Sequence, residues 1–314
     1  MAELMLLDTP SMYFRAFFGV PDSVRAPDGT PVNAVRGLLD FIATLVRLRW
    51  PTHLVACLDA DWRPAFRVAA IPSYKAHRVA APGGDAEEVP DDLELQVPIM
   101  LDVLDALGLV HLGMAGYEAD DVIGTLATTA NCPVDVVTGD RDLFQLVDDE
   151  RRARVLYIAR GISKLEIVDE AWVTKKYAIP GRLYAPFATL RGDPSDGLPG
   201  VPGVGEKTAA ALVSKHGDVA GVLAAAADPQ SGIAPGLRLK LLAAVDYLAV
   251  APAVVSVVCD LPVPVLEARI PAVPRDPEAL LALSDRWGLA GPLNRVLHVL
   301  TENAAAQRAA FTEE

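Results

Sequence analysis

The sequence is poor in features that mark two classes of protein. Its three cysteines, Cys57, Cys132 and Cys259, are isolated from one another, so they form neither a disulfide framework nor the paired spacing of a zinc site. We expect them to be small apolar side chains in a reducing compartment. The longest nearly apolar run, residues 249–259, contains Pro252 and is far shorter than the roughly 18–20 residues that span a membrane. We therefore expect neither a disulfide-rich scaffold nor a membrane protein.

A targeting signal is missing too. The apolar run at residues 4–7 is too short for the core of a signal peptide and has no basic flank. The chain has 314 residues, of which 52% are hydrophobic and 22% charged, which is typical of a folded globular protein with room for a core and a subdomain. The expected location is the cytoplasm.

Positive charge is scarce. The formal net charge is −13, which by itself argues against a nucleic-acid partner. The argument fails if many of the acids form one cluster that divalent cations neutralise. The total charge therefore does not exclude a local basic track for DNA.

What the sequence does contain is aspartate at the ends of short apolar runs. Residues 4–7, 53–58 and 134–137 are predicted as buried strands. The aspartates that follow them are Asp8, Asp59, and Asp140 with Asp142. Helical segments between the strands predict an α/β fold with a mainly parallel sheet and helices on both faces. Ligands bind at the carboxyl ends of such strands, so these aspartates should share one rim.

The stretch from Gly116 to Asp142 joins this rim to a second group of acids. Glu118, Asp120 and Asp121 stand where an apolar-periodic helix begins. The alternative is that acids favour helix N-termini, where each complements the dipole by about 0.3–1 kcal/mol, and that a single aspartate after a strand is a turn residue. That explanation accounts for one or two of the acids but not for the whole set.

Basic and aromatic residues follow the second strand. Residues 61–92 interleave arginine, lysine and histidine with Trp62, Phe66 and Tyr74. This pattern predicts a lid that contacts phosphates and bases, and the alternative is a solvated flexible loop. The lid lies in the chain between two parts of the acidic cluster, which favours the first interpretation.

A second informative segment runs from Arg191 to Thr208. It adds Asp193 and Asp196 and then a glycine-rich turn that leads into a helix. A Walker-type site is rejected because Glu206 stands where the lysine belongs and no strand precedes the turn. We interpret residues 201–205 as a hairpin between two helices whose backbone N–H groups bind phosphate. A plain turn between helices is the alternative.

The remaining pattern completes the expected architecture. Further strands are predicted at residues 109–112, 155–158, 165–168 and 254–259, and further helices at 93–107, 170–177, 219–248 and 278–301. We expect a core at residues 1–185 with an arch or lid at about 61–92. A helical subdomain at 186–260 and closing helices at 261–314 follow.

Several motifs together resemble the bacterial flap endonucleases, or 5′–3′ exonucleases, the family that includes the N-terminal domain of bacterial DNA polymerase I. They are Tyr13-Phe-Arg-Ala-Phe17, Leu58-Asp59-Ala60, Tyr74-Lys-Ala-His-Arg78, Gly116-Tyr-Glu-Ala-Asp-Asp-Val122, Thr138-Gly-Asp-Arg-Asp-Leu143 and Gly192-Asp-Pro-Ser-Asp-Gly-Leu-Pro-Gly200. The resemblance implies a PIN-like 5′-nuclease fold with a helical arch and a helix-hairpin-helix-type motif.

The resemblance further implies hydrolysis of DNA phosphodiesters with two or three Mg²⁺ or Mn²⁺ ions, in replication and repair. The first ion would take Asp8, Asp59, Glu118 and Asp120. The second would take Asp140, Asp142, Asp193 and Asp196, with Asp121 between the two. Hard cations prefer oxygen ligands, which fits a set without histidine or cysteine. Without metal, so many acids would have raised pKa values.

By the same resemblance, Lys75 and Arg78 would be catalytic and would grip the scissile phosphate. The implied DNA-binding residues are Arg15, Arg67, Tyr74, Gly203, Gly205, Lys207 and Thr208. Tyr74 would stack on a displaced base, and K⁺ would bind carbonyls of the hairpin at residues 201–208. The partner would be DNA with 5′ ends, flaps, nicks or gaps, bound by a free-standing, nucleoid-associated monomer.

Two departures and two rival functions accompany this resemblance. The family usually has glycine after its first aspartate, where this chain has Thr9, and no motif maps onto residues 80–92. The rivals are a catalytically weak protein that binds DNA ends on the same fold and a PIN-like ribonuclease. A PIN-like ribonuclease function would leave the hairpin at residues 201–208 unexplained.

Overall fold

The computed structural model describes residues 3–80, 84 and 86–312. Its centre is a six-stranded sheet in the order β3-β2-β1-β4-β5-β6. The strands are β1 (Leu4–Asp8), β2 (His53–Leu58), β3 (Val110–Gly113), β4 (Val134–Thr138), β5 (Ala153–Tyr157) and β6 (Glu166–Val168). All pairs are parallel except β5 with β6. The predicted α/β class is confirmed, and the strands predicted at residues 155–158 and 165–168 form the antiparallel pair at one edge.

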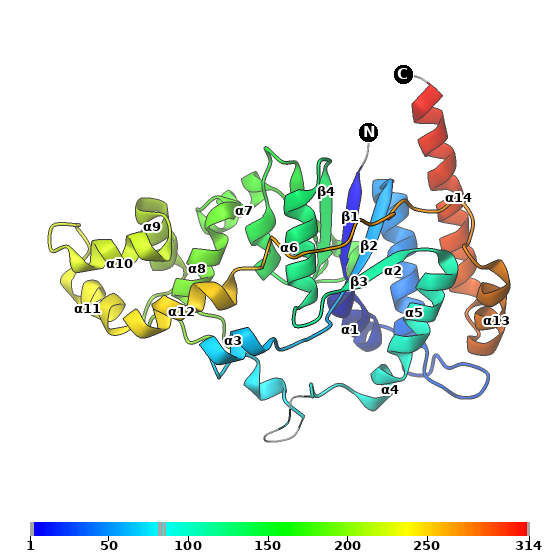
Figure 1. Ribbon diagram of the computed structural model, residues 1–314, viewed down its shortest axis with the longest axis horizontal. Helices are drawn as coiled ribbons and strands as arrows, with labels where there is room; N and C mark the ends of the chain where they lie inside the picture. Colours follow the sequence, from blue (N-terminus) through cyan, green and yellow to red (C-terminus); the bar gives the residue numbers. More distant parts are fainter. Residues whose placement is uncertain (1–2, 81–83, 85, 313–314) are drawn as a thin grey trace.

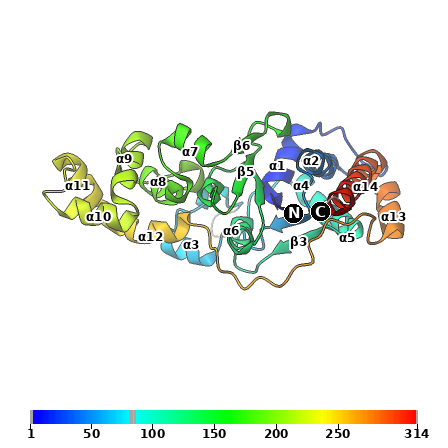
Figure 2. The same ribbon diagram turned by 90° about the horizontal axis from the view of Figure 1, so that it is seen from above.

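Helices cover both faces of the sheet because its inner strands are apolar on both sides. On β1, Leu6 packs into one core, whereas Met5 and Leu7 pack into the other. The first core holds α6 (Ala119–Thr129), and the second holds α1 (Thr9–Gly19), α2 (Asn33–Arg49) and α5 (Gln96–Leu107). Figure 2 shows α6 on one side of the sheet and α1 and α2 on the other.

A helical extension continues the first core away from the sheet. It contains α7 (Glu170–Tyr177), α8 (Tyr184–Arg191), α9 (Glu206–His216), α10 (Val219–Ala227), α11 (Pro235–Ala243) and α12 (Val245–Val255). Phe144, just after β4, stacks edge-on against Trp172 and Tyr184 and so joins this extension to the sheet. The result is the elongated molecule of Figure 1, with α9 to α11 at one end.

The region predicted as an arch holds only short described helices. These are α3 (Ala65–Ala70), a 3₁₀ turn at Ala76–Arg78 and α4 (Asp91–Glu94). In Figure 1, α3 and α4 lie below the sheet. The loop at residues 80–92, to which the sequence assigns no role, lies partly outside the described residues.

The prediction of a strand at residues 254–259 is wrong. Helix α12 continues to Val255, and the chain then crosses α6. There the amide of Val258 donates to Asp121 Oδ1 (2.9 Å), and Thr125 Oγ1 donates to the carbonyl of Val258 (3.3 Å). Side chains of a helix take the hydrogen bonds that a neighbouring strand would have made. Valine content alone could not show this.

The end of the chain returns to the sheet. Helices α13 (Pro277–Trp287) and α14 (Ala290–Thr312) add Leu280, Leu293 and Val296 to the second core, beside α5 and α2 (Figure 1). Among the described residues, no helix is long and apolar enough to cross a membrane.

We predict that Gly37→Ala destabilises the protein. A Cβ at Gly37 of α2 would lie 2.6 Å from Ala16 Cβ of α1, so the two helices must separate. Such overpacking costs about 1–3 kcal/mol, more than the roughly 1 kcal/mol that alanine gains in a helix. Urea unfolding measures the change. The control is Gly236→Ala in α11, where a Cβ meets nothing within 4 Å; equal stability of both variants with the unchanged protein would contradict this packing.

Candidate active site

The predicted acids come from five places that the fold brings to one rim. Asp8 ends β1 and Asp59 follows β2, while Glu118 and Asp120 stand at the start of α6. The others follow β4 (Asp140 and Asp142) or lie in the loop after α8 (Asp193 and Asp196). The register pairs Asp8 with Cys57, next to the end of β2, because neighbouring parallel strands end together.

Asp8 shows how crowded the rim is. Burial, together with the negative charges of Asp59 and Asp140, raises the pKa of its carboxyl to about 7. The hydroxyl of Thr138 donates to Asp8 Oδ2 (2.5 Å) and opposes the rise. Asp8 therefore faces acids that follow two other strands.

The same crowding links the two predicted ion sites. Burial raises the pKa of Asp120 well above its usual value, and Asp8 and Asp140 add to the rise. Burial also raises the pKa of Asp142, and here Asp140, Asp196 and Asp193 contribute. The charge of Asp140 thus raises the pKa of an acid in each group, which links the two groups electrostatically.

Cations of the chain itself engage part of the cluster. Glu118 accepts hydrogen bonds from Lys75 Nζ, from Arg67 Nη1 (2.6 Å) and from Tyr74 Oη (2.8 Å). Burial still raises the pKa of the Glu118 carboxyl, although Lys75 and Arg67 oppose the rise. Arg78 donates to Asp196 Oδ1 at 2.8 Å. Lys75 and Arg78, the two predicted catalytic residues, therefore form ion pairs with Glu118 and Asp196.

The structure corrects the expected roles of Arg67, Tyr74 and Asp121. Arg67 is 2% exposed and forms a bidentate pair with Asp121, which is itself 0% exposed. Tyr74 is also buried, with its hydroxyl on Glu118, so its ring is not available to stack on a base. The basic and aromatic residues of this region suggested a lid that contacts phosphates and bases, but Arg67 and Tyr74 are buried against the acids instead.

The other predicted DNA-binding residues lie at the surface. Gly203, Gly205 and Lys207 are exposed, and Thr208 is half-buried at the start of α9. Gly203 has a φ of +76°, which the turn requires of a glycine. Arg15 is half-buried, and its guanidinium packs against Gly139, which follows β4.

Sequence reasoning missed two cations near these groups. Lys240 Nζ of α11 lies 2.5 Å from where a Cβ of Gly203 would stand, so this ammonium faces the hairpin. Arg191 lies between Asp193 Oδ2 (3.4 Å) and Glu206 Oε1 (3.8 Å), at the entrance to α9. Lys240 belongs to no sequence motif, and Arg191 opens the segment at residues 191–208 without a predicted role, so only the fold shows what these two side chains face.

Comparison with known proteins identifies the family to which this chain belongs. A family model described as the 5′–3′ exonuclease N-terminal, resolvase-like domain matches residues 3–178, and one described as the 5′–3′ exonuclease C-terminal SAM fold matches residues 179–278. The chain belongs to the 5′–3′ exonuclease family. The predicted family and enzyme class, a 5′ nuclease, are confirmed.

Relatives and solved structures agree with this family. A 5′–3′ exonuclease of Streptomyces coelicolor is 62% identical over 95% of this chain and 100% of its own. One of Mycobacterium tuberculosis is 52% identical over 95% of this chain and 98% of its own. A structure of the bacteriophage T5 D15 flap endonuclease with DNA and metal ions has a TM-score of 0.62 at 16% identity, covering 96% and 99% of the two chains, and shares the fold.

The acidic side chains of this exonuclease have the chemical character of ligands for divalent cations. They are all carboxylates, and Asp142 Oδ1 is buried without a hydrogen-bond partner. Within the described part of the chain, no three acidic, histidine or cysteine side chains already form a group that could hold a metal ion. Glu118 and Asp196 point instead to Lys75 and Arg78. The carboxylate oxygens are therefore suitable ligands for a divalent cation. Glu118 and Asp196 must release Lys75 and Arg78 before they can bind one.

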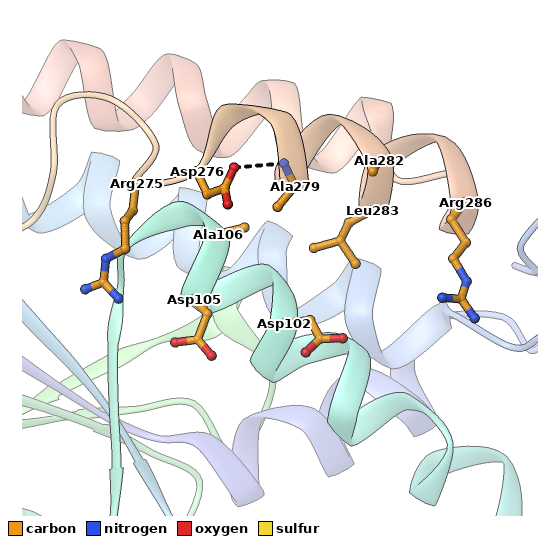
Figure 3. Close-up of a pocket in the computed structure, with 9 residues that line it drawn as sticks. All are labelled: Asp102, Asp105, Ala106, Arg275, Asp276, Ala279, Ala282, Leu283 and Arg286. Carbon is orange, nitrogen blue, oxygen red and sulfur yellow. Dashed lines mark hydrogen bonds between the residues drawn. The ribbon is translucent and has the colours of Figure 1, made fainter.

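A groove elsewhere on the exonuclease belongs to no part of this cluster. It lies between α5 and α13 and is lined by Asp102, Asp105, Leu283, Arg275 and Arg286, among others (Figure 3). None of the predicted site residues lines it.

We predict that the exonuclease in a chelating buffer loses stability as the pH rises. The folded pKa of Asp8, about 7, exceeds the ordinary value of 3.8, so the folded state binds more protons between these values and its stability falls as pH rises through them. Thermal unfolding at pH 5.5 and 8.0 measures this. Excess Mg²⁺ should reduce the decline because it binds the ionised form. A melting temperature in chelator that rises over this range would contradict the crowding.

We predict that Arg67→Met destabilises the fold by about 3–5 kcal/mol, the cost of leaving buried carboxylates without their cation. The matched control is Arg295→Met, whose pair with Asp40 is exposed and contributes at most about 1 kcal/mol. Urea unfolding compares the two. If Arg67 instead contacts DNA, stability will be unchanged and only the affinity for DNA will fall.

Proposed function

We propose that this chain hydrolyses DNA as a structure-selective, metal-dependent 5′ nuclease that acts on free 5′ ends and 5′ flaps. The observation that carries the proposal is the single acidic cluster beside Lys75 and Arg78. The substrate is anionic, so such a cluster is useful only with bound cations. The relatives named as 5′–3′ exonucleases and the flap endonuclease with the same fold support this reading.

We propose two cation sites, one at Asp8, Asp59, Glu118 and Asp120 and one at Asp140, Asp142, Asp193 and Asp196, for Mg²⁺ or Mn²⁺. A pair of divalent cations there supplies Lewis-acid activation of water and stabilises the departing oxygen. Asp121, expected between the two sites, holds Arg67 instead.

Lys75 and Arg78 complete the proposed site. Both side chains would turn from Glu118 and Asp196 to the scissile phosphate if these two carboxylates held cations instead. A fixed positive charge there stabilises the negative charge that develops in the transition state. Arg15, beside Gly139, is proposed to contact the same DNA strand.

The hairpin is proposed to hold the duplex. The side chain of Glu206 is exposed and no side chain caps α9, so the first N–H groups of this helix remain available to a phosphate. Lys207 lies beside them, and Lys240 faces the same turn. K⁺ on carbonyls of residues 201–208 is part of this proposal. So are a monomeric, nucleoid-associated protein and the division into a core (1–185), a DNA-binding subdomain (186–260) and closing helices (261–314).

We predict that Asp142→Asn and Asp120→Asn each reduce turnover by at least about 10²–10³-fold, the cost of losing one group that stabilises the transition state, while duplex binding survives. The measurement uses 5′-labelled flap, nicked duplex and RNA with and without Mg²⁺. Asp285→Asn, on the exposed face of α13, is the control. Binding without any cleavage by the unchanged protein would indicate an end-binding protein, and preferred cleavage of RNA would indicate the ribonuclease.

A further inference from the structure

The segment that carries Lys75 and Arg78 is docked on the loop that carries Asp193 and Asp196. We call residues 73–78 the arch base and residues 192–200 the carboxylate loop. Ser73 Oγ donates to the carbonyl of Gly197 (2.8 Å), and the amide of Lys75 donates to the carbonyl of Asp196 (3.0 Å). These bonds end on backbone carbonyls, so they do not occupy the carboxylate oxygens of Asp193 and Asp196.

Glycine at position 197 makes this docking possible. Its φ is +72°, a region that favours glycine, and a Cβ there would clash with the carbonyl oxygen of Ser73. Any side chain at this position would push the arch base off the carboxylate loop.

Lys75 itself has a left-handed backbone, with φ +49° and ψ +18°. That conformation is uncommon for a residue with a side chain and persists only where the surroundings fix it. Here its amide is held by Asp196. On the other side, Arg63 donates to the carbonyls of Tyr74 (2.6 Å) and Pro72 (2.9 Å).

The carboxylate loop is a firm support. Asp193 and Leu198 exchange two backbone hydrogen bonds (3.0 and 2.8 Å), and the amide of Ser195 donates to Asp193 Oδ1 (2.9 Å). At its neck Gly192 and Gly200 cross so closely that a Cβ on either would collide with the other's backbone. The loop can therefore set the position of whatever docks on it.

We propose that Ser73, Gly197 and Arg63 are positioning residues for the cleavage step. They hold the arch base on the carboxylate loop and so fix Lys75 and Arg78 relative to the ligands of the second proposed cation. This inference rests on the catalytic roles proposed for Lys75 and Arg78. By this proposal, Lys75 and Arg78 and the acids of the second proposed cation site are held in one fixed arrangement.

The test is a double-mutant cycle with Lys75. Ser73→Ala and Gly197→Ala are made alone and together with Lys75→Ala, and Ser73→Thr is made as the conservative variant. Single-turnover cleavage of a 5′-labelled flap with Mg²⁺, over a range of enzyme concentrations, gives the maximal rate and the half-saturating concentration. We expect the maximal rate to fall about tenfold for Ser73→Ala and about a hundredfold for Gly197→Ala, because small misplacements of catalytic groups are costly.

The half-saturating concentration should stay within about twofold, and Ser73→Thr should restore the rate. In the Lys75→Ala background the two substitutions should cost nothing further, because residues that act as a unit are not additive. Equal losses in both backgrounds, or no loss from Ser73→Ala, would overturn the proposal. Gly19→Ala, where a Cβ meets nothing within 4 Å, is the control.

Failures of the two proposals are distinguishable. If Lys75→Ala cleaves like the unchanged protein, the catalytic role of Lys75 is wrong. If Lys75→Ala loses activity and Ser73→Ala does not, only the positioning role is wrong. Thermal unfolding of each variant identifies a Gly197→Ala protein that fails to fold, in which case Ser73→Ala decides alone.

Discussion

Repulsion among acids at one rim of the sheet is the constraint on which this structure depends. A parallel sheet with its strands ending in register places Asp8, Asp59 and Asp140 together, and burial then raises the pKa of Asp8. Buried like charges destabilise a fold unless cations compensate them. Arg67 compensates Asp121 and Glu118 permanently, because it is buried with them. Lys75 and Arg78 compensate Glu118 and Asp196 from a segment nearer the surface. This difference separates the structural cation from the two that are proposed to act on the substrate.

The acidic site and the proposed duplex-binding surface are joined by one short segment of the chain. The carboxylate loop leads from α8, through the crossing of Gly192 and Gly200, directly into the hairpin that begins α9. Arg191 reaches both Asp193 and Glu206 and so ties the two ends of this segment together. A duplex bound at the hairpin, as proposed, would therefore be positioned relative to the second group of acids through a short, hydrogen-bonded segment. The arch base docks on the same segment.

The sequence was sufficient for the fold and for the acids, because both follow from short-range rules. Short apolar runs that end in aspartate predicted β1, β2 and β4, and the parallel arrangement then required the aspartates to meet. It was insufficient where a distant segment decides the outcome. Residues 254–259 have the composition of a strand, but α6 supplies their hydrogen bonds. Arg67 and Tyr74 have the composition of a nucleic-acid surface, but Glu118 and Asp121 draw them into the interior. Ser73 and Lys240 belong to no motif, and Arg191 opens the segment at residues 191–208 without a predicted role. Only the folded chain shows what these three residues face.

Crystals soaked in Mn²⁺ test the central claim most directly, through the positions of the anomalous peaks. The account requires two peaks within the cluster, one among Asp8, Asp59 and Asp120 and one among Asp140, Asp142 and Asp193, with Lys75 displaced from Glu118. Peaks confined to the outer surface, with the contact between Lys75 and Glu118 intact, would contradict it.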